Sequence, residues 1–304
     1  MMQTSQKHIP VMINEVLEFL EPKKGEVYVD TTFGNGGYTK AILESAQCRV
    51  IAMDRDPNVK IRANEIKNMY GERFDFVFGK FGDFKDLIKE KINGVVFDIG
   101  VSSMQLDEAE RGFSFSKPAE LDMRMSCEGI SAKDIVNTYN ESELADLIYA
   151  YGEERKSRQI ARKIVEQRQV KPIETTTELA QIIYKVIHRR FGETDPATRT
   201  FQALRIAVND ELSQLENGLK YASEMLMSGA RLVVVDFHSL EDRIVKNFMK
   251  ENSSKKVKIS KYAPELVTEN SLFSFVSKAI GPSVIECEKN PRARSAKLRY
   301  AIRR

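Results

Sequence analysis

Glycines and carboxylates gather near the start of the chain in a pattern that suits cofactor binding. Asp30-Thr-Thr-Phe-Gly34-Asn-Gly36-Gly37 follows a short β-rich run and opens a helical stretch. Glycines at such a turn allow positive φ and close approach of a ligand to the backbone, and the open amides of a helix N-terminus add a favourable dipole. Asp54 ends the next β-rich run, where a carboxylate can accept both hydroxyls of a ribose. The pattern predicts a site for a ribose-containing cofactor.

NAD, FAD and S-adenosylmethionine all fit this description, and the spacing favours the last. A dinucleotide fingerprint requires G-x-G-x-x-G, but Thr39 occupies the sixth position counted from Gly34. Asp30 would also lie badly beside a pyrophosphate, whereas it suits a cofactor that carries an ammonium and a sulfonium. A glycine-rich connector that binds nothing is the alternative.

A third carboxylate is expected at the same edge of the predicted sheet. Asp98 ends another β-rich run and begins Asp98-Ile-Gly-Val-Ser-Ser103, which Gln105 follows. Ligands of open α/β sheets bind outside the carboxyl ends of the strands, so Asp30, Asp54 and Asp98 should converge. Phe81 follows a further strand and could pack on an adenine, or be a core aromatic.

The elements that position these residues alternate between strand and helix over residues 27–100, which indicates βαβ units and a parallel sheet. From about residue 131 to 219 the pattern is helical, and it returns to α/β with Arg231-Leu-Val-Val-Val235. We predict an α/β domain of residues 1–106 and 211–304, interrupted by a helical insertion of residues 107–210. The expected strands lie at 27–30, 49–53, 74–78, 94–97 and 231–235, and the main expected helices at 38–45, 57–70, 84–91, 141–149, 153–167, 177–188, 198–219 and 240–251.

Composition excludes several classes of protein. The 304 residues are 42% hydrophobic and 30% charged, as in ordinary globular proteins, and no apolar run is long enough for a membrane helix. Three scattered cysteines without CxxC spacing predict reduced thiols and a cytoplasmic location. Residues 239–304 carry 15 Lys and Arg against 7 Asp and Glu, a balance of +8, while the remainder carries −5. This asymmetry suggests a surface that faces a polyanion, although a solvated basic tail would have the same composition.

Ordered motifs extend along nearly the whole chain. They are Asp30-Thr-Thr-Phe-Gly-Asn-Gly-Gly37, Asp54-Arg-Asp56, Asp98-Ile-Gly-Val-Ser-Ser-Met-Gln-Leu-Asp107, Glu110-Arg-Gly-Phe-Ser-Phe115, Leu121-Asp-Met-Arg-Met125, Tyr151-Gly-Glu-Glu-Arg155, Pro196-Ala-Thr-Arg-Thr-Phe-Gln-Ala203, Phe237-His-Ser-Leu-Glu-Asp-Arg243 and Asn290-Pro-Arg-Ala-Arg-Ser295. Together these motifs resemble the RsmH (MraW) family of bacterial ribosomal RNA small-subunit methyltransferases.

The resemblance implies a class I (Rossmann-like) methyltransferase domain with an inserted helical domain. It also implies methylation of the exocyclic N4 of cytidine 1402 in 16S ribosomal RNA, in the decoding centre of the small ribosomal subunit, with S-adenosylmethionine as cofactor. Many relatives have His where this chain has Tyr38, so the resemblance does not extend to that side chain. Carried over by motif, the cofactor contacts are Gly36, Gly37, Tyr38, Asp54, Phe81, Asp98 and Gln105.

The catalytic candidates are Asp98, Ser102, Ser103 and His238. The Asn/Asp-Pro-Pro-aromatic motif of many amino methyltransferases is missing, so we expect Ser102, Ser103 or a nearby backbone carbonyl to accept a hydrogen bond from N4. A neutral His238 could take the departing proton, or it could merely pack while Ser239 caps the next helix. The histidines lack metal-ligand spacing, so no metal site is expected.

RNA contacts are expected where aromatic and arginine side chains could hold an unstacked base. Two further functions stay open, an NAD-dependent oxidoreductase and a non-enzymatic RNA-binding assembly factor, and no stable protein partner can be deduced. The residues suggested for RNA are Arg111, Phe113, Phe115 and Arg124, the basic residues from Arg155 to Arg168, and Arg292, Arg294, Arg299, Arg303 and Arg304.

Overall fold

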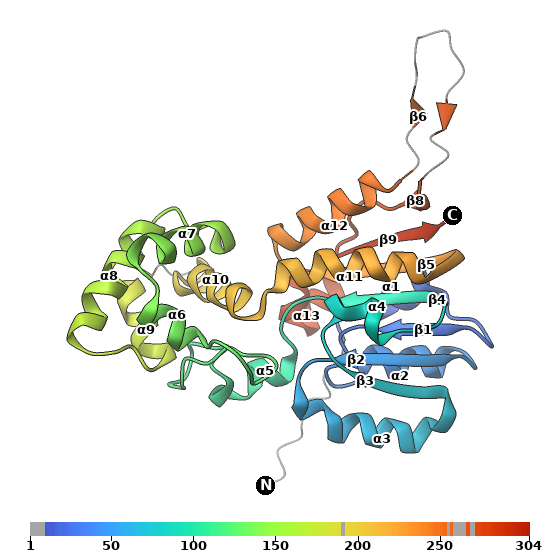
Figure 1. Ribbon diagram of the computed structural model, residues 1–304, viewed down its shortest axis with the longest axis horizontal. Helices are drawn as coiled ribbons and strands as arrows, with labels where there is room; N and C mark the ends of the chain where they lie inside the picture. The colour runs from blue at the N-terminus through green and yellow to red at the C-terminus, as the bar shows by residue number, and fades with distance from the viewer. Residues whose placement is uncertain (1–9, 190–191, 254–255, 258–265, 268–270) are drawn as a thin grey trace. The chain divides into compact units, whose positions relative to one another are not determined.

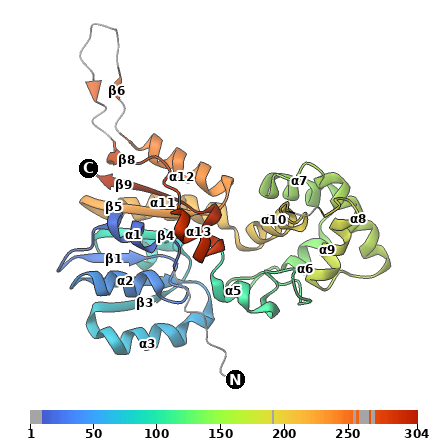
Figure 2. The same cartoon turned by 180° about the vertical axis from the view of Figure 1, so that it is seen from behind.

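A computed structural model describes residues 10–189, 192–253, 256–257, 266–267 and 271–304. The chain forms two compact units (Figures 1 and 2). One contains the described residues up to Gly100 together with Leu212–Arg304, and the other is Val101–Glu211. The first is called the α/β unit below, and the second the helical unit.

A seven-stranded sheet forms the centre of the α/β unit. The strands follow the order β3-β2-β1-β4-β5-β9-β8, in which the first five are parallel and β9 is antiparallel to both neighbours. This is the Rossmann-like order, with β1 and β4 adjacent at the point where the chain reverses direction across the sheet. The strands are β1 (Val27–Asp30), β2 (Arg49–Asp54), β3 (Phe74–Phe78), β4 (Ile92–Asp98), β5 (Leu226–Asp236), β8 (Phe273–Val276) and β9 (Lys297–Arg303).

Helices cover both faces of this sheet, which explains why its central strands are apolar runs without alternation. Val233, Val234 and Val235 of β5 are all fully buried. One face packs against α4 (Phe84–Leu87), α11 (Glu211–Met225) and α12 (Ser239–Glu251). The opposite face carries α1 (Ile13–Leu20), α2 (Gly37–Ser45) and α3 (Lys60–Tyr70). The shorter elements of this unit are α13 (Val284–Lys289) and a separate two-stranded sheet of β6 (Lys256–Val257) and β7 (Leu266–Val267).

The helical unit has a hydrophobic core of its own. Leu144, Ile160 and Leu204 are fully buried within it, each from a different helix. Four of its helices begin with a capping box, in which a Ser, Thr or Asn side chain bonds the third backbone amide of the helix. Its helices are α5 (Ser103–Asp107), α6 (Ala132–Thr138), α7 (Glu141–Gly152), α8 (Ser157–Val170), α9 (Thr176–Tyr184) and α10 (Ala197–Asn209).

The α/β class with an all-helical insertion is confirmed, and several details differ from the prediction. Strands β8 and β9 were not predicted, and the helix expected at 84–91 ends at Leu87. The single helix expected at 198–219 is wrong, because Asp210 adopts a left-handed conformation (φ 50°) that ends α10 before α11 begins. The helical unit also begins at Val101 rather than at residue 107, because Val101 and Leu106 pack against the helical core. Among the described helices, none is long and apolar enough to cross a membrane.

Candidate active site

The loop from Thr31 to Gly36 is tied to the ends of three neighbouring strands. The backbone amide of Thr32 donates to Asp30 (3.2 Å), and that of Gly34 donates to Asp54 (2.7 Å). The Thr32 hydroxyl accepts from the backbone amide of Asp98 (2.9 Å). The loop therefore brings the ends of β1, β2 and β4 together, as the sequence predicts for Asp30, Asp54 and Asp98. Thr32 is absent from the predicted site, although its position two residues after the end of β1 is a signal that could have indicated it.

Asp30 is a structural residue rather than a ligand group. It is fully buried, and one carboxylate oxygen accepts from both the backbone amide (3.1 Å) and the hydroxyl (2.6 Å) of Thr39. These bonds fasten the first turn of α2 to the end of β1. The interpretation of Asp30 as a partner for a cationic cofactor is not supported, because its side chain is fully buried and bonded to the loop and the helix.

The glycines of the loop make room for protein atoms. Gly36 has φ 75°, and a Cβ there would lie 2.4 Å from Cδ1 of Ile66. A Cβ on Gly37 would lie 2.2 Å from Cγ of Pro10. Neighbouring side chains, together with the positive φ of Gly36, already favour glycine at both positions, and the predicted cofactor contacts of Gly36 and Gly37 stay predictions.

Asp54 can still accept the hydrogen bonds from ribose hydroxyls that the sequence analysis predicts. Its two carboxylate oxygens accept one backbone amide each, from Gly34 (2.7 Å) and Asp56 (2.9 Å). A carboxylate oxygen can accept a second hydrogen bond. Burial, only partly offset by these two backbone hydrogen bonds, raises the pKa of Asp54 to about 6. The side chain is held in place and can still accept hydroxyl donors.

Asp98 carries an oxygen that the protein does not satisfy. Its Oδ1 is buried and has no hydrogen-bond partner within the described part of the chain. Burial, followed by the charges of Asp30 and Glu241, raises the pKa of Asp98 well above its usual range. A buried acceptor without a donor is costly, and a cationic or hydrogen-bonding ligand would remove that cost.

Tyr38 and Phe81 are both turned toward the protein. Tyr38 is 4% exposed, and its hydroxyl donates to the backbone carbonyl of Val11. A cofactor contact at Tyr38 would therefore have to use the backbone. Phe81 is half-buried and packs edge-to-face on Phe97, with ring centroids 5.8 Å apart.

The predicted residues after Asp98 belong to the helical unit. Ser102 caps α5: its hydroxyl accepts from the Gln105 amide (3.2 Å), while Oε1 of Gln105 accepts from the Ser102 amide (3.0 Å). This capping box engages both side chains in local structure. Ser103 is the first residue of α5, and its side chain is outside the described part of the structure.

His238 is the N-cap of α12. Its Nδ1 accepts from the backbone amide of Glu241 at 3.5 Å, and its Nε2 lies 3.1 Å from Oε1 of the same residue. The expected alternative, a cap formed by Ser239, is wrong because Ser239 is already the first helical residue.

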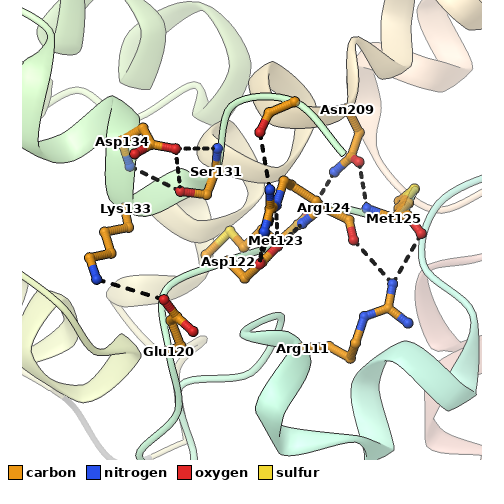
Figure 3. A network of polar contacts seen from close by, with 11 residues as sticks. Arg111, Glu120, Asp122, Met123, Arg124, Met125, Ser131, Lys133, Asp134 and Asn209 are labelled. Carbon is orange, nitrogen blue, oxygen red and sulfur yellow. Dashed lines mark hydrogen bonds and ion pairs between the residues drawn. The ribbon is translucent and has the colours of Figure 1, made fainter. Parts of the chain in front are cut away.

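The residues suggested for an unstacked base hold the helical unit together (Figure 3). Nη2 of Arg111 donates to the carbonyls of Arg124 and Met125, both at 3.1 Å, and Arg124 pairs with Asp122 at 2.7 Å. Phe113 is 8% exposed in the helical core, and Phe115 packs on Phe201. These contacts explain the residues by packing and local charge pairing, so the interpretation as a base-holding cluster is not supported.

Comparison with known proteins assigns the family. The sequence profile described as the MraW methylase family matches residues 5–304. The chain belongs to the MraW methylase family. The resemblance of its motifs to this family is therefore confirmed. Proteins named ribosomal RNA small subunit methyltransferase H from Rickettsia massiliae (strain Mtu5) and Rickettsia africae (strain ESF-5) are each 57% identical over 300 residues, covering 97% of this chain and 98% of theirs.

More distant similarity extends to solved methyltransferase structures. TrmN from Thermus thermophilus gives a TM-score of 0.44 at 7% identity, over 96% of this chain and 48% of that one. The N-methyltransferase NodS from Bradyrhizobium japonicum WM9 gives 0.42 at 9% identity, over 96% and 93%. The assignment to the MraW methylase family rests on the sequence matches alone.

Proposed function

We propose that the protein transfers a methyl group from S-adenosylmethionine to 16S ribosomal RNA of the small subunit, at the exocyclic N4 of cytidine 1402. Family membership supports the reaction class, and the relatives at 57% identity carry the name of the small-subunit RNA enzyme. The observation that carries the proposal is the unsatisfied Oδ1 of Asp98, beside a loop that also holds Asp54.

The residues at this edge of the sheet fit the cofactor. When bound, S-adenosylmethionine supplies a methyl group activated on a sulfonium sulfur. Asp54 would accept from ribose hydroxyls with the lone pairs that Gly34 and Asp56 leave free. Asp98 would offer its free oxygen to the positively charged part of the cofactor, which would favour the ionised form of a carboxyl that burial otherwise disfavours.

Positioning would supply most of the rate enhancement, because methyl transfer to an amine is an in-line displacement. The N4 lone pair is delocalised into the cytosine ring, so an acceptor for an N4 hydrogen would make it a better nucleophile. We assign that role to Ser102, Ser103 or a neighbouring backbone carbonyl. Ser102→Ala/Ser103→Ala removes both hydroxyl acceptors, so turnover should fall with little loss of cofactor affinity, while the lost cap of α5 costs about 1 kcal/mol of stability.

The test is to incubate the protein with methyl-labelled S-adenosylmethionine and small ribosomal subunits that lack the modification, then digest the RNA to nucleosides. We expect label in N4-methylcytidine. Asp98→Asn keeps the shape of the side chain but removes its charge, so cofactor affinity should fall by about tenfold or more. Asp86→Asn, at an exposed position on α4, is the matched control.

Two results would contradict the proposal. Label in another nucleoside would show that the methyl group is transferred to a different atom of the RNA. Absence of label, with cofactor binding confirmed by calorimetry, would instead favour an RNA-binding assembly factor that retains the cofactor site.

A further inference from the structure

A basic cavity lies on the α/β unit between α12 and the β8–β9 edge of the sheet. Its volume is about 450 Å³, within the range of ligand pockets in general. Met249 and Val276 supply an apolar floor, and Lys246, Lys250 and Lys278 carry the basic groups of its lining. These residues play no part in the proposed methyl transfer.

The three lysines have no carboxylate partner among the residues that the structure describes. Lys246 and Lys250 lie one turn apart on α12, and all three are exposed. Like charges at this helical spacing repel each other. Some other lysines of the unit are paired with carboxylates, as in Lys40–Glu44 (3.6 Å) and Lys67–Asp75 (3.1 Å). The position of Lys250 in the last turn of α12 is favourable by itself, but Lys246 and Lys278 lack that explanation.

Two further groups give the cavity the character of an anion site. Arg299 also lines it, although its Nε already pairs with Asp242 at 2.7 Å. The Ser277 hydroxyl oxygen accepts from the backbone amide of Tyr300 (2.9 Å), which leaves its hydrogen available for an acceptor in the cavity. Lysine and serine side chains are common donors to the phosphates of nucleic acids.

We propose that this cavity binds the backbone of single-stranded RNA, with Lys246, Lys250 and Lys278 on its phosphates. The inference rests on the proposed function, since it assigns a second contact surface to the same RNA substrate. Charge complementarity carries it: the cavity lies in the segment 239–304, which holds a balance of +8 on a chain that is otherwise −5. The apolar floor would accommodate the sugar or base of the nucleotide whose phosphate the lysines hold.

The salt dependence of binding measures the contribution of the cavity directly. The affinity of the full chain for a fluorescein-labelled oligouridine is followed by anisotropy at increasing salt, for the wild type and for Lys246→Gln/Lys250→Gln/Lys278→Gln. Loss of three phosphate contacts should reduce the slope of log K against log salt by about 2, since each contributes about 0.7 for a single strand. At low salt the affinity should fall by about tenfold to a hundredfold.

A matched triple variant controls for net charge. Lys85, Lys89 and Lys91 are exposed lysines of the same unit outside this cavity, and Lys85→Gln/Lys89→Gln/Lys91→Gln should leave the slope unchanged. Equal slopes for the cavity variant and the wild type would overturn the inference, and so would equal losses in the two triple variants. Competition by poly-glutamate that is stronger than competition by unlabelled oligouridine, and that depends on these lysines, would overturn it in favour of an acidic protein segment.

The measurements distinguish failure of the proposed methyl transfer from failure of the proposed RNA contact at the cavity. S-adenosylmethionine affinity, measured by calorimetry, should be the same in the wild type and in both triple variants, which shows that the fold is intact. If the wild type methylates small subunits but the slopes are equal, only the cavity assignment is lost. If no methylation occurs but the slopes differ as expected, only the proposed reaction is lost.

Discussion

Carboxylates at the ends of neighbouring strands in this sheet have different tasks because their partners differ. Asp30 is fully buried, with one oxygen bonded to the amide and hydroxyl of Thr39, and therefore holds the fold. Asp54 has one backbone donor on each oxygen and can accept more. Asp98 has an oxygen with no donor in the described structure. The same residue type thus ranges from structural to ligand-ready over three adjacent strands.

Asp236, at the end of β5, extends this comparison to the stability of the protein. It is fully buried, and neither carboxylate oxygen has a hydrogen-bond partner among the described residues. Burial raises its pKa to about 8; Asp242 and Glu241 add to the rise, while Lys297 and Arg299 oppose it. Because an unfolded Asp titrates near 4, the folded protein alone retains this proton between about pH 4 and about pH 8.

The free energy of unfolding should therefore fall as the pH rises through that interval, since the folded state binds the extra proton. Asp236→Asn removes this titration. Urea unfolding at several pH values should show that the wild type loses at least about 2 kcal/mol more than the variant between pH 5 and pH 8.5. The exposed Asp86→Asn should follow the wild type, and parallel profiles for Asp236→Asn and wild type would show that Asp236 is already ionised in the folded protein.

At the scale of elements, the sequence identified the five parallel strands of the sheet but not β8 and β9, and it placed the helix ends less well. Strands such as 27–30 and 74–78 are marked by short apolar runs, and the structure has them at the predicted residues. The break between α10 and α11 depends on one left-handed residue, Asp210, in a pattern that is otherwise continuous. The pattern contains no glycine or proline there, and Asn209-Asp210 is only a weak signal for a helix end.

The residues of the candidate site could also be predicted only in part from the sequence. Asp54 and Asp98 could be placed because strand ends in a parallel sheet meet at one edge. The contacts that the side chains of Tyr38, Phe113 and Arg124 make within the protein could not be predicted, because they depend on side-chain packing that residue spacing does not encode.

Substitution of His238 separates capping from proton transfer. Asn is a good N-cap but cannot accept a proton near neutral pH. His238→Asn should keep the free energy of unfolding within about 0.5 kcal/mol of the wild type, whereas His238→Ala should lose about 1 kcal/mol. We also expect His238→Asn to retain methyl transfer in the labelling assay, because both ring nitrogens of His238 face Glu241. A stable His238→Asn protein with lost turnover would instead assign His238 to proton transfer.

At the scale of the whole molecule, each unit has its own core. Leu144, Ile160 and Leu204 belong to the core of the helical unit, and Val95, Leu219 and Leu232 to that of the α/β unit. A unit with its own core can fold independently. The helical unit is therefore more than a loop between two strands of the sheet.

A fragment of residues 101–211 should accordingly fold by itself. We expect a helical circular dichroism spectrum and a cooperative urea transition. Leu144→Ala should lower the free energy of unfolding of the fragment by about 3 kcal/mol, because a fully buried leucine is removed. Tyr149→Ala, at a side chain that is 62% exposed, is the control and should change it little. A fragment without a cooperative transition would show that this core needs the α/β unit.

The position of β9 in the sheet has a consequence for folding during synthesis. It follows every other strand along the chain, yet lies between β5 and β8 in the sheet. During synthesis, β5 leaves the ribosome before β9, the strand that covers its open edge in the folded sheet, and β8 also pairs with β9 there. The nascent chain must therefore keep an apolar, unpaired strand edge from aggregating until residues 297–303 have emerged.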